Sequence, residues 1–260
     1  MISPNELFSV KDRFAVVTGG TRGIGYDIAE ALVAGGATVV ISSRKAEACE
    51  TAAAALSKLG TVYGFPADLS TMDGITALKD FVAEKTDKVD ILINNAGAVW
   101  GSTLSDFPES GWDKVMDINL KSPFFLTQAF FPLIKKAASK EQPAKIVNVA
   151  SVEGLRPAKM ETYSYGASKS ALIHLTKHLA DQLASMNICV NAIAPGPFAT
   201  KMLKGTLDAV GEDTISSQVP LGRLGTSEDL YALGLYLSSS ASDYVTGQTI
   251  AVGGGMGTIA

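Results

Sequence analysis

The 260-residue sequence has very few cysteines and histidines, which bears on disulfides and metal sites. Its two cysteines, Cys49 and Cys189, are too few for a disulfide framework and favour a reducing compartment. Its two histidines, His174 and His178, have an i,i+4 spacing on a predicted helix, as some zinc ligands do. Zinc needs three or four ligands, and there is no third histidine and no glutamate directly after the first. We therefore expect no metal site.

The sequence also lacks a basic run and a long apolar run. Acidic residues outnumber basic ones by 26 to 22, and the formal net charge is -4, so neither nucleic acid nor an anionic membrane surface is an expected partner. No apolar stretch is long enough to cross a bilayer, and residues 1–11 lack the apolar segment of a signal peptide. These absences predict a soluble, cytoplasmic protein with no membrane partner.

Apolar residues are plentiful, at 47% of the chain, and their pattern alternates between strand and helix. Continuous apolar runs are typical of strands buried on both faces of a parallel sheet. Strand-like runs cover residues 14–17, 38–42, 61–66, 89–93, 145–150, 188–194 and 249–252. The alternation predicts an α/β protein, a doubly wound Rossmann fold with a seven-stranded parallel sheet and helices on both faces. No linker rich in Pro, Gly or Ser divides residues 1–260, so we expect a single domain.

The ends and interruptions of several helices can also be predicted. Ser70 and Ser227 are candidate N-caps, because a serine side chain can accept hydrogen bonds from the free N–H groups of a first turn. A long helix is expected over residues 112–139, bent or interrupted at Pro123 and Pro132. Further along, residues 198–225 show only short helical pieces.

A glycine-rich turn joins the first strand to the first long helix, with the sequence Thr18-Gly19-Gly20-Thr21-Arg22-Gly23-Ile24-Gly25. Glycines allow a ligand to approach the backbone, and a helix N-terminus presents free N–H groups and a positive dipole end. The turn therefore predicts a phosphate-binding site. Its T-G-x-x-x-G-x-G spacing is not the G-x-G-x-x-G dinucleotide fingerprint, so an ordinary tight turn is the alternative.

The residues after the second strand indicate which nucleotide this turn would bind. Proteins that bind NAD usually carry Asp or Glu there to hold the ribose 2′-hydroxyl, whereas this chain has Ser42-Ser43-Arg44-Lys45. Ser43 and Arg44 would hold a 2′-phosphate, which a carboxylate would repel, and Arg22 adds a positive charge from the glycine turn. We expect NADP(H) rather than NAD(H). The alternative is a solvated basic loop at the start of a helix.

Three further motifs follow along the chain. Asn94-Asn95-Ala96-Gly97 comes after the fourth strand, Ser151 ends the fifth, and Tyr165-Gly166-Ala167-Ser168-Lys169 opens the next long helix. With the glycine turn, these motifs resemble the short-chain dehydrogenase/reductase family over residues 14–255, and within it the NADP-dependent ketoacyl and ketone reductases. The resemblance implies an NADPH-dependent oxidoreductase that reduces a ketone to a secondary alcohol by hydride transfer, with a tyrosine as general acid.

The tyrosine motif also has a chemical rationale. Tyr165 and Lys169 lie on one face of a helix, and a nearby ammonium and an oxidised nicotinamide both favour the phenolate and lower the pKa of the phenol. Tyr165 would give a proton to the carbonyl oxygen, while Ser151 hydrogen-bonds the same oxygen. The resemblance further implies that Lys169 binds the nicotinamide ribose and that Asn119 joins a proton relay. The alternative is a partly buried aromatic residue and a solvated lysine.

The resemblance also implies a wider set of cofactor contacts. Asp68 and Leu69 match the family's adenine position, residues 95–97 match the stretch beside the adenine ribose, and residues 195–200 match the segment beside the nicotinamide. The implied cofactor-binding residues are Gly19, Thr21, Arg22, Gly23, Ile24, Gly25, Ser43, Arg44, Asp68, Leu69, Asn95, Ala96, Gly97, Tyr165, Lys169, Pro195, Gly196 and Thr200. The chain departs from the family pattern in a longer Ser151-to-Tyr165 connection and in Gly253, where Asp is common.

The substrate class is predicted from apolar residues around the expected site. Residues 198–219 form the expected lid, and Tyr163 is not the catalytic tyrosine because it has no lysine at i+4. The expected pocket residues are Trp100, Val152, Tyr163, Phe198 and Met202. This composition favours a small-molecule 3-oxoacyl or other apolar carbonyl substrate.

Two other functions use the same sequence features. An NADP-dependent secondary-alcohol dehydrogenase would run the reaction in the oxidative direction. A non-catalytic nucleotide-binding sensor would keep the fold without needing Ser151, Tyr165 and Lys169 together.

Apolar residues on more than one side of the helices around residues 124–131 and 172–184 suggest subunit contacts. The family usually assembles as dimers or tetramers, so we expect a homotetramer.

Overall fold

The computed structural model describes residues 3–158 and 160–259, apart from the side chains of residues 201, 202, 204, 206 and 209. Within these residues, seven parallel strands form one sheet in the order β3-β2-β1-β4-β5-β6-β7, which confirms the predicted fold class. The strands are β1 (Phe14–Thr18), β2 (Thr38–Ser43), β3 (Val62–Pro66), β4 (Ile91–Asn94), β5 (Ala144–Val149), β6 (Ile188–Pro195) and β7 (Thr249–Val252). Each predicted strand is present, with ends shifted by at most a few residues.

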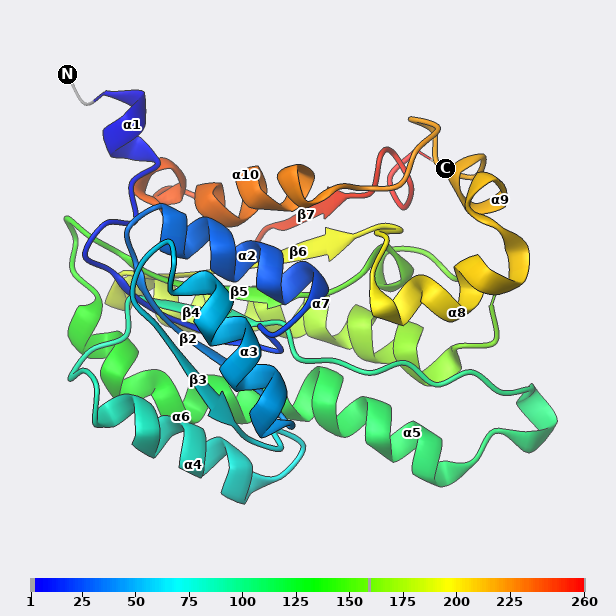
Figure 1. Ribbon diagram of the computed structural model, residues 1–260, viewed down its shortest axis with the longest axis horizontal. Coiled ribbons are helices and arrows are strands. Elements are labelled where there is room, and N and C mark those ends of the chain that lie inside the picture. Colours follow the sequence, from blue (N-terminus) through cyan, green and yellow to red (C-terminus); the bar gives the residue numbers. More distant parts are fainter. Residues whose placement is uncertain (1–2, 159, 260) are drawn as a thin grey trace.

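Helices cover both faces of this sheet (Figure 1). On one face lie α2 (Gly23–Ala34), α3 (Ala46–Leu56) and α10 (Ser227–Ser238). On the other lie α4 (Met72–Ala83), α6 (Ser122–Ala137) and α7 (Tyr163–Leu183). The remaining helices are α1 (Pro4–Leu7), α5 (Glu109–Met116), α8 (Lys201–Val210) and α9 (Glu212–Ser216), with short helical turns between elements.

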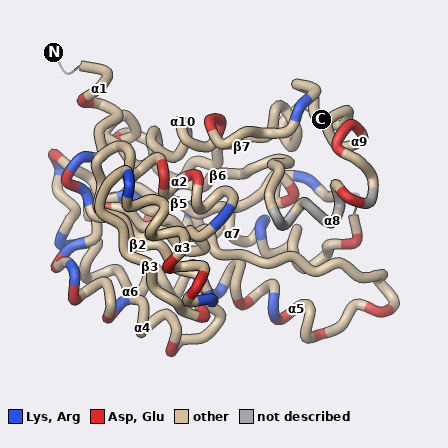
Figure 2. The backbone as a smooth tube through the Cα atoms, viewed as in Figure 1, with Lys and Arg blue, Asp and Glu red and all other residues tan. Residues whose placement is uncertain are grey.

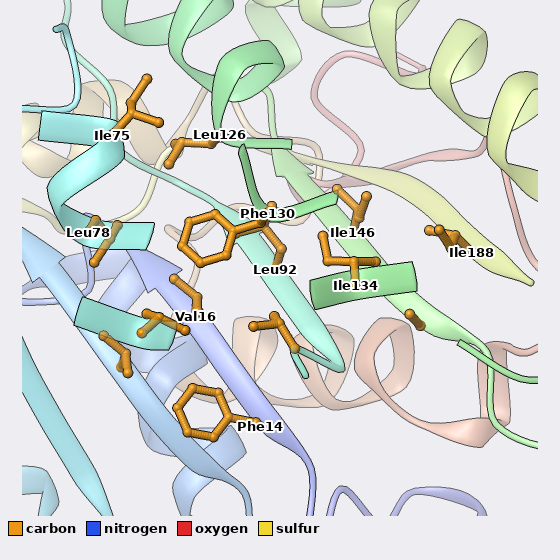
Figure 3. Packing of buried hydrophobic residues seen from close by; sticks show 14 of the residues in the cluster. Phe14, Val16, Ile75, Leu78, Leu92, Leu126, Phe130, Ile134, Ile146 and Ile188 are labelled. Atoms are coloured by element: carbon orange, nitrogen blue, oxygen red, sulfur yellow. The ribbon is translucent and has the colours of Figure 1, made fainter. Parts of the chain in front are cut away.

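The two cores follow from the alternation of side chains along each strand. In β1, Val16 faces the layer of α4, α6 and α7, while Ala15 and Val17 face α2, α3 and α10. Figure 3 shows the first of these cores, where Phe130 from α6 packs beside Leu92 of β4. Both faces of the sheet are therefore apolar, as the continuous apolar runs predicted.

Both predicted N-caps are wrong by one residue. The α4 cap is Thr71, whose side chain accepts from Gly74 N at 3.1 Å. The α10 cap is Thr226, which forms a capping box with Asp229. In both helices the cap is a threonine next to the predicted serine. The local backbone conformation decides which of the two hydroxyls reaches the N–H groups of the first helical turn.

The long helix predicted over residues 112–139 is divided at the first proline and not at the second. It forms α5, a π-helical segment η2 (Asp117–Lys121) and then α6, which begins beside Pro123. Pro132 lies inside α6 and does not end it. The carbonyl that loses its partner there belongs to Gln128, and both residues are exposed, so water can satisfy it.

No helix among the described residues is long and apolar enough to cross a membrane. Figure 2 shows acidic and basic residues interspersed along the helices and loops of the view.

The carboxyl ends of β1 and β4, neighbours in the sheet but not in the chain, mark the point where the strand order reverses. Ligands of doubly wound sheets bind outside this edge.

Candidate active site

The glycine turn lies at this edge, between β1 and α2. Gly19 and Gly23 adopt left-handed backbone conformations, with φ of 65° and 53°, which L side chains rarely adopt. Arg22 occupies the N-cap position of α2 without any side-chain cap, so the first N–H groups of the helix remain available to a phosphate. A side chain at Gly23 would lie 3.1 Å from Thr200, so the turn also closes against the segment after β6.

Asn95 fixes the turn from the side of β4. Its Nδ2 donates to Thr18 O at 2.9 Å and to Gly19 O at 3.1 Å. The Thr18 hydroxyl in turn accepts from the backbone N–H groups of Asn95 and Ala96 and donates to Ile93 O. The N-N-A-G motif therefore holds the phosphate turn in position through these hydrogen bonds.

Arg44 and Ser43 lie at the end of β2, beside the loop that follows β3. Arg44 is exposed, and its charge helps to lower the pKa of Asp68, although the largest contribution comes from the Ser70 hydroxyl. The structure thus brings Arg44 and Asp68 to the same corner of the sheet edge. A guanidinium that is free to point into solvent can also reach a 2′-phosphate.

Ser151, Tyr165 and Lys169 converge beyond the end of β5. Lys169 is buried, its Nζ donates to Val149 O at 2.6 Å, and it lies 5.7 Å from the centre of the Tyr165 ring. Ser151 stands at the N-cap of the short helical turn η3 (Val152–Gly154), where its Oγ accepts from Glu153 N at 3.2 Å. The three side chains of the expected catalytic set are therefore within one small region.

Burial dominates the pKa values of this region. Burial raises the pKa of Tyr165 to about 12, Ser151 lowers it by a smaller amount, and the charge of Glu153 raises it further. Burial also lowers the pKa of Lys169 to about 8. In the protein by itself, desolvation outweighs the ammonium of Lys169, because that group is itself desolvated and is hydrogen-bonded to Val149. Tyr165 is thus a protonated phenol at neutral pH.

Asn119 lies inside the π-helical segment η2 and is fully buried. Its side chain exchanges two hydrogen bonds with Ala98, at 2.8 and 2.9 Å, and donates to Ser168 Oγ at 3.0 Å. Pro123 has no N–H to give to the Asn119 carbonyl. A side chain at Gly97 would lie 3.1 Å from Asn119 Oδ1 and 3.7 Å from Lys169 Nζ, so both residues border the same space.

Comparisons with known proteins decide the family. A family model described as "Enoyl-(Acyl carrier protein) reductase" matches residues 19–257. A rhamnolipids biosynthesis 3-oxoacyl-(acyl-carrier-protein) reductase of Pseudomonas aeruginosa is 42% identical over 252 residues, which cover 96% of this chain and 98% of that protein. The chain belongs to the short-chain dehydrogenase/reductase family.

A further relative and a solved structure are also similar to this chain. A 2-dehydro-3-deoxy-D-gluconate 5-dehydrogenase of Bacillus subtilis is 37% identical, over 96% of this chain and 97% of its own. The RhlG/NADP active-site complex of Pseudomonas aeruginosa superposes with a TM-score of 0.94 at 42% identity, covering 97% of this chain and 99% of that one. The chain is an oxidoreductase of the short-chain dehydrogenase/reductase family, and its relatives act on chemically different substrates.

The expected pocket residues of this short-chain dehydrogenase/reductase lie in different surroundings. The indole of Trp100 packs against α5 at Gly111, with Lys114 Nζ 5.0 Å from its ring. Phe198 is buried against Gly225, at the start of residues 198–219, where the lid is expected. Val152 is buried under the turn around Gly257. Tyr163 is 40% exposed and meets the ring of Phe107 edge-on. The side chain of Met202 lies outside the described residues.

The segment after β6 meets the chain terminus. A side chain at Gly196 would lie 2.6 Å from Gly253 Cα, so these two glycines stack directly on each other. A side chain at Gly253 would in turn lie 3.0 Å from Met256 O and 3.1 Å from Val152. A side chain at this position would therefore require the terminal turn or Val152 to move by a few tenths of an ångström.

Two residues of the site were missed by the sequence reasoning. Ser168 joins Asn119 to the Tyr165 carbonyl, which accepts from its hydroxyl at 2.8 Å. Glu153 is half-buried beside the catalytic tyrosine. Ser168 stands within the tyrosine motif and Glu153 two positions after Ser151, but only the fold shows where their side chains point.

The two histidines and the two cysteines lie away from this edge. His174 and His178 are both exposed on α7. Cys49, in α3, and Cys189, in β6, are buried and free of disulfides. Over residues 3–158 and 160–259, no group of three or more His, Cys, Asp or Glu side chains is arranged to hold a metal ion.

Proposed function

We propose that the protein is an NADPH-dependent reductase that converts a ketone, of the 3-oxoacyl or another apolar class, to a secondary alcohol. The observation that carries this proposal is the convergence of Ser151, Tyr165 and Lys169 beyond β5, where Lys169 Nζ is anchored to Val149 O at 2.6 Å. A nucleotide sensor has no need of these three groups in one place. In the reductive direction Tyr165 gives up its phenolic proton, which a phenol that is protonated at neutral pH carries.

The residues of the sheet edge fit NADP(H). The uncapped start of α2 and the left-handed Gly19 and Gly23 suit a pyrophosphate, and Ser43 and Arg44 suit a 2′-phosphate. When bound, the nicotinamide supplies or accepts a hydride. The known structure with which the chain superposes is described as a complex with NADP.

The roles of the chain's own groups follow from their positions. Tyr165 donates its phenolic proton to the substrate oxygen, and the Ser151 hydroxyl hydrogen-bonds that oxygen as negative charge develops on it. Lys169 holds the nicotinamide ribose and places a positive charge beside the phenol. The Asn119 carbonyl, which Pro123 cannot satisfy, accepts a hydrogen bond from the water that returns the proton.

The relatives support two substrate classes, 3-oxoacyl thioesters and sugar acids. An apolar cavity beside Tyr163 favours the first. Leu104, Phe107, Pro108 and Trp112 border a cavity of about 320 Å³ together with Tyr163 and Glu109. An acyl chain gains free energy on such a surface, whereas a polyhydroxy acid would leave hydroxyl groups without partners.

Loss of NADPH absorbance with a panel of carbonyl compounds tests the function. We expect turnover with 3-oxoacyl thioesters of increasing chain length and little with 2-dehydro-3-deoxy-D-gluconate derivatives or other sugar acids. Turnover confined to the oxidation of alcohols or sugar acids with NADP+ would favour the dehydrogenase alternative. Binding of NADPH with no reaction in either direction would favour the sensor.

We further infer a homotetramer in the cytoplasm. Phe124 is 39% exposed on α6, and Phe125 and Phe131 of the same helix are only partly buried, so this face has apolar area that a partner subunit can cover. Light scattering at micromolar concentration tests the assembly, and a monomer there would contradict it.

A further inference from the structure

Glu153 lies between Ser151 and the start of the helix that carries Tyr165. It follows Ser151 in the short helical turn η3 and is half-buried. Its Oε2 accepts from the Thr162 hydroxyl at 3.1 Å. Thr162 occupies the N-cap position of α7, the helix that carries Tyr165 and Lys169. Glu153 therefore bridges the turn that carries one catalytic group and the helix that carries the other two.

The turn and the helix also touch at a second point. A side chain at Gly154 would lie 2.7 Å from the backbone of Lys169, and the Ser170 hydroxyl donates to Gly154 O at 2.8 Å. The contact at Gly154 sets the distance between η3 and α7. The bond from Thr162 to Glu153, about two turns nearer the start of the helix, is a second tie between them. Together the two contacts determine where Ser151 lies relative to the phenol.

The charge of Glu153 acts on the same phenol. Lys169 Nζ lies 5.7 Å from the centre of the Tyr165 ring on the same helix, and the charge of Glu153 on η3 adds to the larger effect of burial in raising the pKa of Tyr165. A carboxylate near a phenol disfavours the phenolate, while the ammonium of Lys169 favours it. The carboxylate also lies near the positive dipole end of α7, where a negative charge is stabilised. No ion pair to Glu153 exists among the described residues, so its charge is not neutralised by one of them.

We propose that Glu153 is a positioning residue that ties the Ser151 turn to the start of α7 and whose negative charge disfavours the phenolate form of Tyr165. The proposal rests on the proposed reductase function. Burial raises the pKa of Glu153, and the hydrogen bond from Thr162 lowers it by a smaller amount. The negative charge of the Glu153 carboxylate in turn raises the pKa of Tyr165. These directions agree with the geometry.

Two substitutions separate the charge from the hydrogen bond. Glu153→Gln keeps an oxygen that can accept from Thr162 and removes the charge. We expect the pH at which alcohol oxidation with NADP+ reaches half its maximal kcat/KM to fall by roughly 0.5–1 unit, because the phenolate becomes easier to form. Thr162→Val removes the hydrogen bond and keeps the charge, so it should lower kcat and the midpoint of thermal unfolding without lowering that pH.

Glu161→Gln is the matched control, because Glu161 is an exposed carboxylate in the same connection. It should leave the pH profile in place. A Glu153→Gln profile that coincides with wild type overturns the electrostatic role. A Thr162→Val enzyme with wild-type kcat and thermal midpoint overturns the positioning role.

A second readout does not depend on turnover. The phenolate absorbance of Tyr165 can be isolated, with NADP+ present, as the difference between each protein and its counterpart that also carries Tyr165→Phe. We expect this titration to move to lower pH in Glu153→Gln. If it moves while no carbonyl compound is reduced, the inference on Glu153 stands and the proposed function fails. If turnover is found and neither the profile nor the titration moves, the inference fails alone.

Discussion

The side chain of Asn95 occupies the space that a side chain at Gly25 would need: a Cβ built there would lie 2.2 Å from Asn95 Nδ2. The same amide would lie 2.8 Å from a side chain at Gly19. Two glycines of the phosphate turn are therefore required by the protein's own packing, independently of any ligand. The turn and the N-N-A-G motif form one structural unit.

Gly25→Ala tests this relationship. We expect a loss of stability of about 1–3 kcal/mol from overpacking, together with weaker NADPH binding because Asn95 can no longer hold the turn. Thermal unfolding and fluorescence titration with NADPH measure the two effects. Gly205→Ala is the control, since a side chain at that helical position would meet nothing within 4 Å. Equal stability of Gly25→Ala and wild type would show that Asn95 adjusts without cost.

Arg44→Asp should reverse the choice of nucleotide. A charge-assisted hydrogen bond contributes about 1.5–3 kcal/mol, so kcat/KM with NADPH should fall roughly 10- to 150-fold while that with NADH is kept or raised. Lys58→Asp makes the same charge change at an exposed site near the end of α3 and should leave the ratio unchanged. An unaltered NADPH/NADH ratio in Arg44→Asp would refute the 2′-phosphate contact.

Tyr165→Phe should abolish turnover and leave NADPH binding intact. In the proposed mechanism the phenol is the proton donor, and loss of a general acid lowers kcat by about 10²–10⁴-fold. Tyr163→Phe is the matched control, because that phenol is 40% exposed and has no lysine at i+4. It should retain a kcat near that of wild type. Steady-state kinetics of both variants decides which tyrosine acts, and an active Tyr165→Phe enzyme would remove Tyr165 from the mechanism.

Asp243→Asn should destabilise the fold without altering catalysis. Lys145 is buried at 1% exposure near the start of β5, and its Nζ meets Asp243 Oδ1 at 2.7 Å. Removing the carboxylate leaves a buried ammonium without its ion-pair partner, which should lower the free energy of unfolding by roughly 2–4 kcal/mol. Lys145→Met should cost less, because the Asp243 side chain is 33% exposed and water can solvate it. Chemical denaturation measures both, and a larger loss in Lys145→Met would contradict this asymmetry.

Much of the site could be predicted from the chain because its motifs stand at the ends of predicted strands. Parallel strands bring their carboxyl ends to one edge, so motifs after β1, β4 and β5 had to meet there. The spacing of Tyr165 and Lys169 likewise places them on one helical face. What could not be predicted was the degree of burial of this region, which raises the pKa of Tyr165 in the chain by itself.

The sequence by itself determined the order of strands and helices, the phosphate turn and the identity of the groups beyond β5, because periodicity and glycine positions are local properties. Only the tertiary structure decided how those groups are held. Asn95 fills the space above Gly25, the Asn119 side chain binds Ala98 and Ser168, and Glu153 reaches the start of α7. Each is a contact between segments that are distant along the chain or meet only when a helix turns, so the packing of the folded chain determines it.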